Sequence, residues 1–433
     1  MQFIILSYFF TYIFSEILLP IKIIENENFN EINNIIMSNL YISTKIGTNK
    51  QNINLLLKFS TYQIYLSDYL NNKNYFNYNK SNSFIIYDSN SSFYLQDFKE
   101  HFFCKDNFYL DKIQISQLNF VLAKELLYYN VSGCFGLKIN DANFNVNTEF
   151  NLIKQLKKKD IINSYCFTLL FDNKNNNGEI LIGDYPHEIK TFNDKYLFEE
   201  NNFFYTKSYF QDDLFSWSLV FDNITHNNQQ VYHNYNIGEL QIEIGGIVAP
   251  NYFQDMINVS FFKVLFESKK CEIKITNISL YKYIYYTCDK DVNIKEFKEI
   301  NFYIKNIRLN ISLNYNDLFI KRNNKYVFLI FFKDYSFKKW ILGKPFLKKE
   351  IFTFDLDKKI IGYYKNKNYY VINNNKLNLN LILLLFLSFV LIIILVIILF
   401  KKKINFRKKY ANELNDQYEY NTDYKSINLT KVV

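Results

Sequence analysis

The stretch WILGKPFLKKEIFTFDLDKKIIGYY, residues 340–364, decides the fold of this chain. Short apolar and aromatic runs alternate in it with Lys, Asp and Gly, and this pattern extends back to Asn39. Such runs between turn-forming residues predict strands, and helical periodicity is confined to residues 150–158 and 252–262. The fold class is therefore all-β with a few short helices. The clearest predicted strands are residues 54–59, 84–87, 167–171, 179–182 and 326–331.

Outside this stretch, the composition excludes several classes of protein. The chain has 433 residues, of which 49% are hydrophobic, and a formal net charge of +9. It is thus neither a small disulfide scaffold, nor collagen-like, nor wholly disordered. The tail from Lys401 holds eight Lys or Arg and four Asp or Glu, which supplies +4 of the +9. The remaining charge forms no basic stripe, so we expect no nucleic-acid partner.

Cysteine and histidine spacing predicts no metal site and no cofactor. No Cys pair has C-x-x-C spacing, and no His pair forms an H-E-x-x-H motif. The odd number of cysteines leaves at least one thiol unpaired within the chain. The cysteines are Cys104, Cys134, Cys166, Cys271 and Cys288.

Both ends of the chain carry apolar segments. The apolar core of residues 1–20 predicts a signal peptide or hydrophobic leader, the alternative being a buried first strand. Residues 381–400 are uncharged and long enough to cross a bilayer as one helix. The basic start of the tail, 401–433, places that tail in the cytosol, and residues 365–380 form an Asn- and Lys-rich stalk. We therefore expect a single-pass type I protein of the secretory pathway or cell surface, with a lumenal or extracellular ectodomain.

Several segments, in order, resemble the pepsin-like aspartic peptidases. In the first half, IGTNKQ (46–51) resembles the family's I-G-T-P-P-Q turn, and residues 84–95 resemble its flap hairpin, with Tyr87 at the place of the flap tyrosine. NVSGCFGL (130–137) resembles D-G-I-L-G-L. Residues 111–115 and 150–184 resemble further strands and a helix of the family in the same order.

The second half continues the resemblance. Trp217 lies in a segment similar to the Y-W-x-V strand, and Cys271 and Cys288 correspond to the family's C-lobe disulfide. Residues 340–364 resemble the W-I-L-G-D-x-F-L ending, and the composition is similar to that of membrane-anchored, plasmepsin-like members from apicomplexan parasites. The resemblance implies a bilobed fold with a peptide cleft between the lobes. Its predicted N-terminal lobe is residues 39–190 and its C-terminal lobe is residues 191–364.

The family's chemistry needs one Asp from each of two D-[TS]-G loops, and the two carboxylates share one proton. This sequence has no D-[TS]-G. Alignment from the 46–51 turn places Lys58 at the first Asp position; Asp88, in DSNSS, is the competing candidate. In the second loop, ELQIEIGGIVAP, Glu243 falls at the Asp position, and a different gap places Gln241 there instead.

These substitutions predict a non-catalytic homologue that binds a peptide or protein in its cleft. Lys58 and Glu243 either face each other as an ion pair or point to solvent in remodelled loops. Tyr87 is the expected binding residue, and Gly136 and Gly343 are expected to be structural. Two alternatives stay open. One is a divergent endopeptidase that uses Glu243 with Asp88, and the other is a structural membrane protein with a closed cleft.

Overall fold

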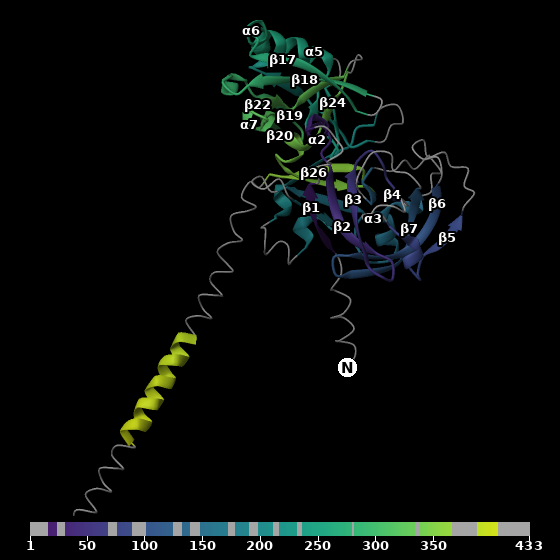
Figure 1. Cartoon of the computed structure of the whole chain (residues 1–433), viewed down its shortest axis with the longest axis vertical. Helices are drawn as coiled ribbons and strands as arrows, with labels where there is room; N and C mark the ends of the chain where they lie inside the picture. Colours follow the sequence, from purple (N-terminus) through teal and green to yellow (C-terminus); the bar gives the residue numbers. More distant parts are fainter. Residues whose placement is uncertain are drawn as a thin grey trace, which may run out of the picture. The chain divides into compact units, whose positions relative to one another are not determined.

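The computed structural model describes thirteen segments of the chain (Figure 1). They fall into two compact units, residues 1–367 and 368–433, each of which is described by itself. The described segments are residues 16–23, 31–67, 76–88, 101–123, 132–138, 148–171, 178–189, 198–210, 216–231, 236–278, 281–333, 338–365 and 388–405.

Short strands are the main secondary structure of the first unit, as the sequence predicts. The strands of its first half are β1 (Ile17–Ile23), β2 (Leu40–Ile46), β3 (Gln51–Lys58), β4 (Ile64–Ser67), β5 (Ile85–Asp88), β6 (His101–Leu110), β7 (Ile113–Ala123), β8 (Gly133–Gly136), β9 (Cys166–Phe171) and β10 (Gly178–Ile182). Those of its second half are β11 (Phe203–Lys207), β12 (Ser218–Val220), β13 (Asn223–His226), β14 (Gln229–Gln230), β15 (Ile237–Leu240), β16 (Ile247–Val248), β17 (Cys271–Ile278), β18 (Tyr281–Asp289), β19 (Ile300–Ile304), β20 (Leu309–Leu313), β21 (Phe319–Arg322), β22 (Lys325–Phe328), β23 (Ile330–Lys333), β24 (Trp340–Leu342), β25 (Ile351–Asp355) and β26 (Ile360–Tyr364).

The helices of this unit are short. The α-helices are α2 (Glu31–Ile36), α3 (Leu152–Lys158), α5 (Asn251–Ile257), α6 (Lys263–Glu267), α7 (Tyr315–Leu318) and α8 (Lys344–Leu347). A π-helix, η5 (Asn258–Phe262), joins α5 to α6. The 3₁₀-helices are η1 (Tyr78–Lys80), η2 (Thr148–Phe150), η3 (Pro186–Glu188), η4 (Glu200–Asn202) and η6 (Ile294–Glu296).

The predicted elements exist, with shifted ends. The predicted helix 150–158 begins only at Leu152, because Asn151 caps it by accepting a hydrogen bond from the backbone N–H of Lys154. The predicted helix 252–262 continues beyond Phe262 into α6. The predicted strand 326–331 is two strands, because β22 ends at Phe328 and β23 begins at Ile330.

Three sheets form the unit, and the largest crosses the predicted boundary between the lobes. Its thirteen strands run in the order β11-β26-β25-β9-β10-β1-β2-β3-β8-β4-β7-β6-β5. A boundary at residue 190 therefore does not separate the sheets, because β25 pairs with β9 of the first half and is followed in the same sheet by β26 and β11. A nine-stranded sheet built on β15, β16, β18, β23 and β24 and a four-stranded sheet of β13, β14, β19 and β20 complete the unit.

The start of the chain departs from the predicted leader. β1 begins at Ile17 and lies between β10 and β2, with Ile17, Leu19 and Ile21 buried. Residues 17–20, the end of the predicted leader, therefore belong to the sheet. Residues 1–15, which hold the apolar core of the predicted leader, lie outside the described residues.

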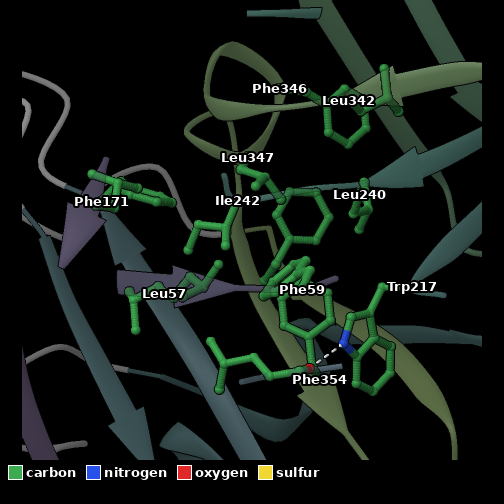
Figure 2. Packing of buried hydrophobic residues seen from close by; sticks show 14 of the residues in the cluster. Leu57, Phe59, Phe171, Trp217, Leu240, Ile242, Leu342, Phe346, Leu347 and Phe354 are labelled. Carbon is green, nitrogen blue, oxygen red and sulfur yellow. Dashed lines mark hydrogen bonds between the residues drawn. The ribbon is translucent and has the colours of Figure 1, made fainter. Parts of the chain in front are cut away.

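The two halves are joined by a buried apolar cluster (Figure 2). Phe59, just after β3, stacks edge-on against Phe354 with ring centroids 5.0 Å apart. Trp217 packs on the same Phe354 ring at 5.1 Å, and its indole N–H donates to the backbone oxygen of Leu137 at 2.8 Å. Trp217 therefore connects the second half to the first.

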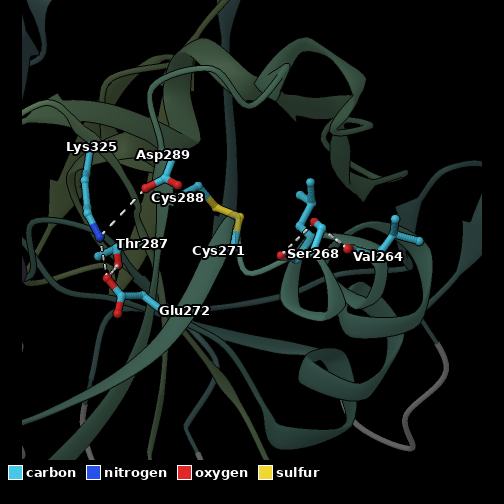
Figure 3. Close-up of a disulfide and its surroundings, with 9 residues drawn as sticks. Val264, Ser268, Cys271, Glu272, Thr287, Cys288, Asp289 and Lys325 are labelled. Carbon is cyan, nitrogen blue, oxygen red and sulfur yellow. Dashed lines mark hydrogen bonds and ion pairs between the residues drawn. A yellow bond between two sulfur atoms is a disulfide. The ribbon is translucent and has the colours of Figure 1, made fainter.

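The disulfide implied by the family resemblance is present (Figure 3). Cys271 and Cys288 join the ends of β17 and β18, with their Cα atoms 4.0 Å apart. Cys104, Cys134 and Cys166 are also buried. Small apolar behaviour is expected of such buried thiols.

The second unit is described over residues 388–405, which are helical. The predicted membrane span, 381–400, begins outside the described residues, as do the stalk after residue 365 and the tail after residue 405. Within the described segments, no helix has both the length and the apolar character that a membrane crossing requires.

Candidate active-site loops

Two loops occupy equivalent places in the two halves. In the first half, β3 runs parallel to β8 and ends where Lys58 lies beside Gly136. The chain then forms a loop and returns as β4, antiparallel to β8, with Ile64 beside Phe135. The first loop therefore spans the residues between Lys58 and Ile64.

The second half repeats this arrangement. β15 runs parallel to β24 and ends where Leu240 lies beside Leu342. The chain returns as β16, antiparallel to β24, with Ile247 beside the same Leu342. Gln241, the next residue after β15, therefore lies beside Gly343.

The strand registers decide which residues correspond. Phe135 pairs with a residue on each side of the first loop, and Leu342 does the same in the second loop. Leu57, the partner of Phe135, therefore corresponds to Leu240, the partner of Leu342. The residues that follow them, Lys58 and Gln241, then correspond to each other. The same count matches Ser60 with Glu243. The structure thus favours the alternative alignment with Gln241, and Glu243 lies two residues beyond the position that the sequence assigned to it.

A glycine lies beneath each loop because the backbone approaches it too closely for a side chain. A Cβ atom on Gly136 would lie 2.6 Å from the backbone oxygens of Thr61 and Gln63. A Cβ atom on Gly343 would lie 2.2 Å from the backbone oxygen of Ile244. The structural role predicted for both glycines follows from these contacts.

Glu243 connects the two loops. Its Oε2 accepts a hydrogen bond from the backbone N–H of Phe59 at 3.0 Å, and its Oε1 accepts one from the backbone N–H of Ser60 at 2.9 Å. Hydrogen bonds to an ionised carboxylate are stronger than neutral ones. A side chain of the second loop therefore satisfies two backbone donors of the first.

The charges of Lys58 and Glu243 both affect the pKa of the buried Cys134 thiol. Burial raises the pKa of Cys134, the charge on Lys58 lowers it, and the charge on Glu243 raises it. The two charges therefore have opposite effects on the pKa of the Cys134 thiol. The described contacts of the Glu243 carboxylate go to backbone N–H groups, and its predicted direct ion pair with Lys58 stays a prediction.

The side chain of Gln241 is held within its own half. Its Nε2 donates to Oε1 of Glu239 at 2.6 Å. The other oxygen of Glu239 forms an ion pair with Lys339. The carboxylate nearest in sequence before the second loop is thus engaged by an amide and an ammonium group.

The segment after α2 supports the second loop from behind. The backbone N–H of Ser38 donates to the backbone oxygen of Glu243 at 2.9 Å, and the N–H of Gly245 donates to the oxygen of Ile36 at 2.7 Å. Met37 and Ile244 form a β-bridge between these two bonds. The backbone of Glu243 is therefore fixed on the side opposite to its carboxylate.

Comparison with known protein families assigns the chain to one of them. The family model described as eukaryotic aspartyl protease matches residues 40–365, which is most of the first unit. The chain belongs to this family. A comparison with curated protein sequences returned no match. The predicted pepsin-like fold is therefore confirmed at the level of the family.

Lys344 is a site residue of this aspartyl protease family member that the sequence analysis did not single out. The signal was present, because the family pattern W-I-L-G-D has Asp where this chain has Lys344. Its backbone N–H donates to the oxygen of Ile244, so it borders the second loop. Burial, and then the charge on Lys348, lower the pKa of Lys344 to about 7.

Replacing Lys344 by methionine is expected to stabilise the protein. At pH 6 both the folded and the unfolded chain carry a protonated lysine, so the folded state bears the cost of a partly buried charge. Its removal should raise the free energy of unfolding by about 2–4 kcal/mol, given 1.36 kcal/mol per pKa unit. Between pH 7 and 10.5 the unfolded lysine keeps its proton and the folded one loses it, so wild-type stability rises with pH and the gain shrinks.

Urea unfolding of the full chain at pH 6 and pH 9.5 checks this expectation. The exposed Lys305→Met variant is the matched control, with a change below about 0.5 kcal/mol. A Lys344→Met variant that is less stable than wild type at pH 6 would contradict the buried placement of this ammonium group.

Tyr87 lies on β5, the last strand of the large sheet, against an aromatic cluster. Its ring stacks on Phe150, with centroids 6.5 Å apart, and Phe150 packs on Phe103 at 4.5 Å. The ammonium group of Lys105 lies 4.7 Å from the centre of the Tyr87 ring. Asp88, the competing candidate for the first catalytic position, is the last residue of β5, so it belongs to this hairpin and not to the first loop.

The metal prediction concerns clusters of His, Cys, Asp and Glu. Within the described segments of this aspartyl protease family member, no three such residues come together as a metal-binding group. The expectation that the protein uses no metal and no cofactor stays a prediction.

Proposed function

We propose that this aspartyl protease family member is non-catalytic and binds a peptide or protein partner. The observation that carries the proposal is the matched pair of positions at the ends of β3 and β15. Lys58 occupies the first and Gln241 the second. General acid–base catalysis by the family's mechanism needs a carboxylate at each of them, one ionised and one protonated.

The chemistry of the substitutes supports a loss of proteolysis. A lysine ammonium cannot accept a proton from water, and a neutral amide cannot serve as a carboxylate base. Lys58 is the cationic substitute in the first loop. Lys344 is another one, beside the second loop, at a position where the family pattern has an acid. Two of the three departures from the family pattern thus exchange a negative charge for a positive one.

The divergent-endopeptidase alternative has little support from the neighbouring carboxylates. Both oxygens of Glu243 accept backbone hydrogen bonds from the first loop. Glu239 is engaged by Gln241 and Lys339. The alternative needed Glu243 to act with Asp88, and Asp88 lies at the end of β5.

Binding is supported by the exposed edge of the first sheet. Ile85, Ile86 and Tyr87 of β5 are each at least 40% exposed. An edge strand with exposed apolar side chains is a common place for an extended peptide to pair. The closed-cleft alternative is favoured by the stack of Tyr87 on Phe150, because the protein's own aromatic rings then fill the space behind β5.

The same proposal places the protein on a membrane. Its support is the sequence: residues 381–400 are apolar and uncharged, and a basic run follows from Lys401. The folded unit would then lie on the lumenal or extracellular side, in the secretory pathway or at the cell surface. The disulfide between Cys271 and Cys288 is consistent with an oxidising compartment.

Incubation of the purified full chain with a diverse peptide library from pH 4 to 7.5 tests the loss of catalysis. Mass spectrometry should find no cleavage that a transition-state-mimicking aspartic peptidase inhibitor suppresses. Any background from a contaminating protease should persist unchanged in the Glu243→Gln variant. Inhibitor-sensitive cleavage that disappears in Glu243→Gln would overturn the non-catalytic assignment.

Selection of extended peptides on the immobilised full chain tests binding. A selected peptide should lose roughly tenfold in affinity with Tyr87→Ala, the scale of a well-packed aromatic anchor. Tyr205→Ala, an exposed tyrosine on β11, should leave its affinity unchanged. If wild type selects no peptide and Phe150→Ala does, the closed-cleft alternative holds instead.

A further inference from the structure

β17 is an edge strand in the second half of the chain. It pairs with β18 over all eight of its residues, without a bulge, and it has no strand partner on its other side within the described sheets. Figure 1 shows β17 next to β18 and α6. Natural edge strands usually avoid pairing with other chains by means of proline, a bulge or several charges. β17 has neither proline nor bulge, and its one lysine is Lys274.

The backbone groups that face outward can be assigned from the pairing pattern. The Cα atoms of Cys271 and Cys288 are 4.0 Å apart, which is the spacing of a non-hydrogen-bonded antiparallel pair. Alternation then makes Lys274 a hydrogen-bonded partner of β18. Ile273 and Ile275 direct their N–H and C=O groups away from β18, toward the free edge.

The side chains of this edge are apolar on one face and charged on the other. Ile273 and Ile275 are 51% and 54% exposed. Glu272 and Lys274 lie on the opposite face, where they form an ion pair with each other at 3.2 Å, and Glu272 forms a second one with Lys325 at 2.6 Å (Figure 3). The edge thus offers free backbone groups, exposed isoleucines and one charge of each sign.

We propose that β17 pairs antiparallel with β17 of a second copy of this chain, about a two-fold axis at Ile273. In this register Glu272 lies opposite Lys274 of the second copy, and Lys274 opposite Glu272, so both charge pairs are favourable. Ile273 of each copy forms the central hydrogen-bonded pair. The two C-terminal sheets then become one continuous sheet.

Charge selects this register over its neighbours. An axis at Lys274 would set the two ammonium groups directly opposite each other, which is destabilising. An axis at Ile275 would set Lys274 opposite Thr276 and would form no charge pair. Asn277, which lies in an N-x-S sequon, falls outside the five residues, 271–275, that pair about Ile273.

The contact is small, and the association is therefore weak. Five paired residues on each side bury less than the roughly 1,200 Å² of a standard stable interface. A chemical crosslink on the axis is the suitable probe, because it captures a transient pair. Ile273→Cys places one thiol on the axis in each copy.

Mild oxidation of full-length Ile273→Cys in detergent micelles, followed by a non-reducing gel, tests the proposal. A dimer band that reducing agent removes is expected. Val220→Cys, an equally exposed thiol on β12, is the matched control and should stay monomeric. Failure of Ile273→Cys to crosslink above the Val220→Cys control overturns the proposal.

A second variant separates the strand edge from other contacts between copies. Ile275→Pro removes an N–H that points to the free edge, so it leaves the pairing with β18 intact. Added to Ile273→Cys, it should lower the crosslinked fraction about tenfold, since proline blocks edge pairing. Its melting temperature should match that of Ile273→Cys. Undiminished crosslinking with a native melting temperature would assign the contact to another part of the chain and overturn the proposal.

Discussion

Replacing Gly343 by alanine is expected to destabilise the folded chain severely. The added Cβ atom would lie 2.2 Å from the backbone oxygen of Ile244 and 2.4 Å from that of Gly246. Both atoms belong to the second loop, which is fixed from behind by its hydrogen bonds to residues 36–38. The backbone cannot withdraw, so we expect a loss of at least about 4 kcal/mol, the range of the most severe single substitutions. That is a large part of the 5–15 kcal/mol that typically stabilises a domain.

Gly362→Ala is the matched control for this prediction. Its Cβ atom would lie 2.2 Å from the ring of Phe203, a side chain that can rotate away, so the cost should be about 1 kcal/mol. Urea unfolding of both full-length variants, followed by the fluorescence of Trp217 and Trp340, measures the difference. A Gly343→Ala variant as stable as Gly362→Ala would mean that the second loop does not cross Gly343 as closely as described.

The sequence predicts well those features that local chemistry determines. Gly136, Gly343 and Trp217 are predicted because the short segments around them resemble motifs of the family. The disulfide between Cys271 and Cys288 needs just two cysteines in the family's order. In each case the residue type and its near neighbours carry the information.

The features that the sequence misses depend on pairing between distant segments. Glu243 was aligned to the second Asp position by counting along the chain, whereas the register of β15 on β24 gives that position to Gln241. The alignment of this loop is ambiguous by two residues, and no nearby residue type distinguishes the two alignments. Similarly, β1 joins the large sheet through β10, more than 150 residues away, which residue types near β1 do not reveal.

Replacing Glu243 by alanine is expected to loosen the junction of the two loops. The substitution removes both acceptors of the backbone N–H groups of Phe59 and Ser60. Phe59 is buried, so its N–H is left without a partner, whereas Ser60 is exposed and water can replace the carboxylate. We expect a loss of about 3 kcal/mol in the free energy of unfolding, since a hydrogen bond to a charged group contributes 1.5–3 kcal/mol. Glu243→Gln retains one acceptor oxygen and should lose about half as much.

Hydrogen exchange locates this effect. The amide of Phe59 should exchange about a hundredfold faster in Glu243→Ala if the local opening free energy falls by roughly 3 kcal/mol. Glu267→Ala, at an exposed glutamate that ends α6, should change neither stability nor exchange. Unchanged exchange at Phe59 would show that Glu243 does not bridge the loops in solution.

A double-mutant cycle with Lys58→Met then separates the backbone role of Glu243 from the predicted ion pair. If the carboxylate serves only the two N–H groups, the effects of Glu243→Ala and Lys58→Met add within about 0.5 kcal/mol. If the ammonium group also pairs with it, removal of Glu243 alone leaves a half-buried charge without its counterion. The double variant should then be more stable than the sum of the single losses predicts, by about 1 kcal/mol or more. The sign and size of this coupling free energy decide between two roles of Lys58. Either its ammonium group forms an ion pair with Glu243, or it only replaces the family's aspartate without such a pair.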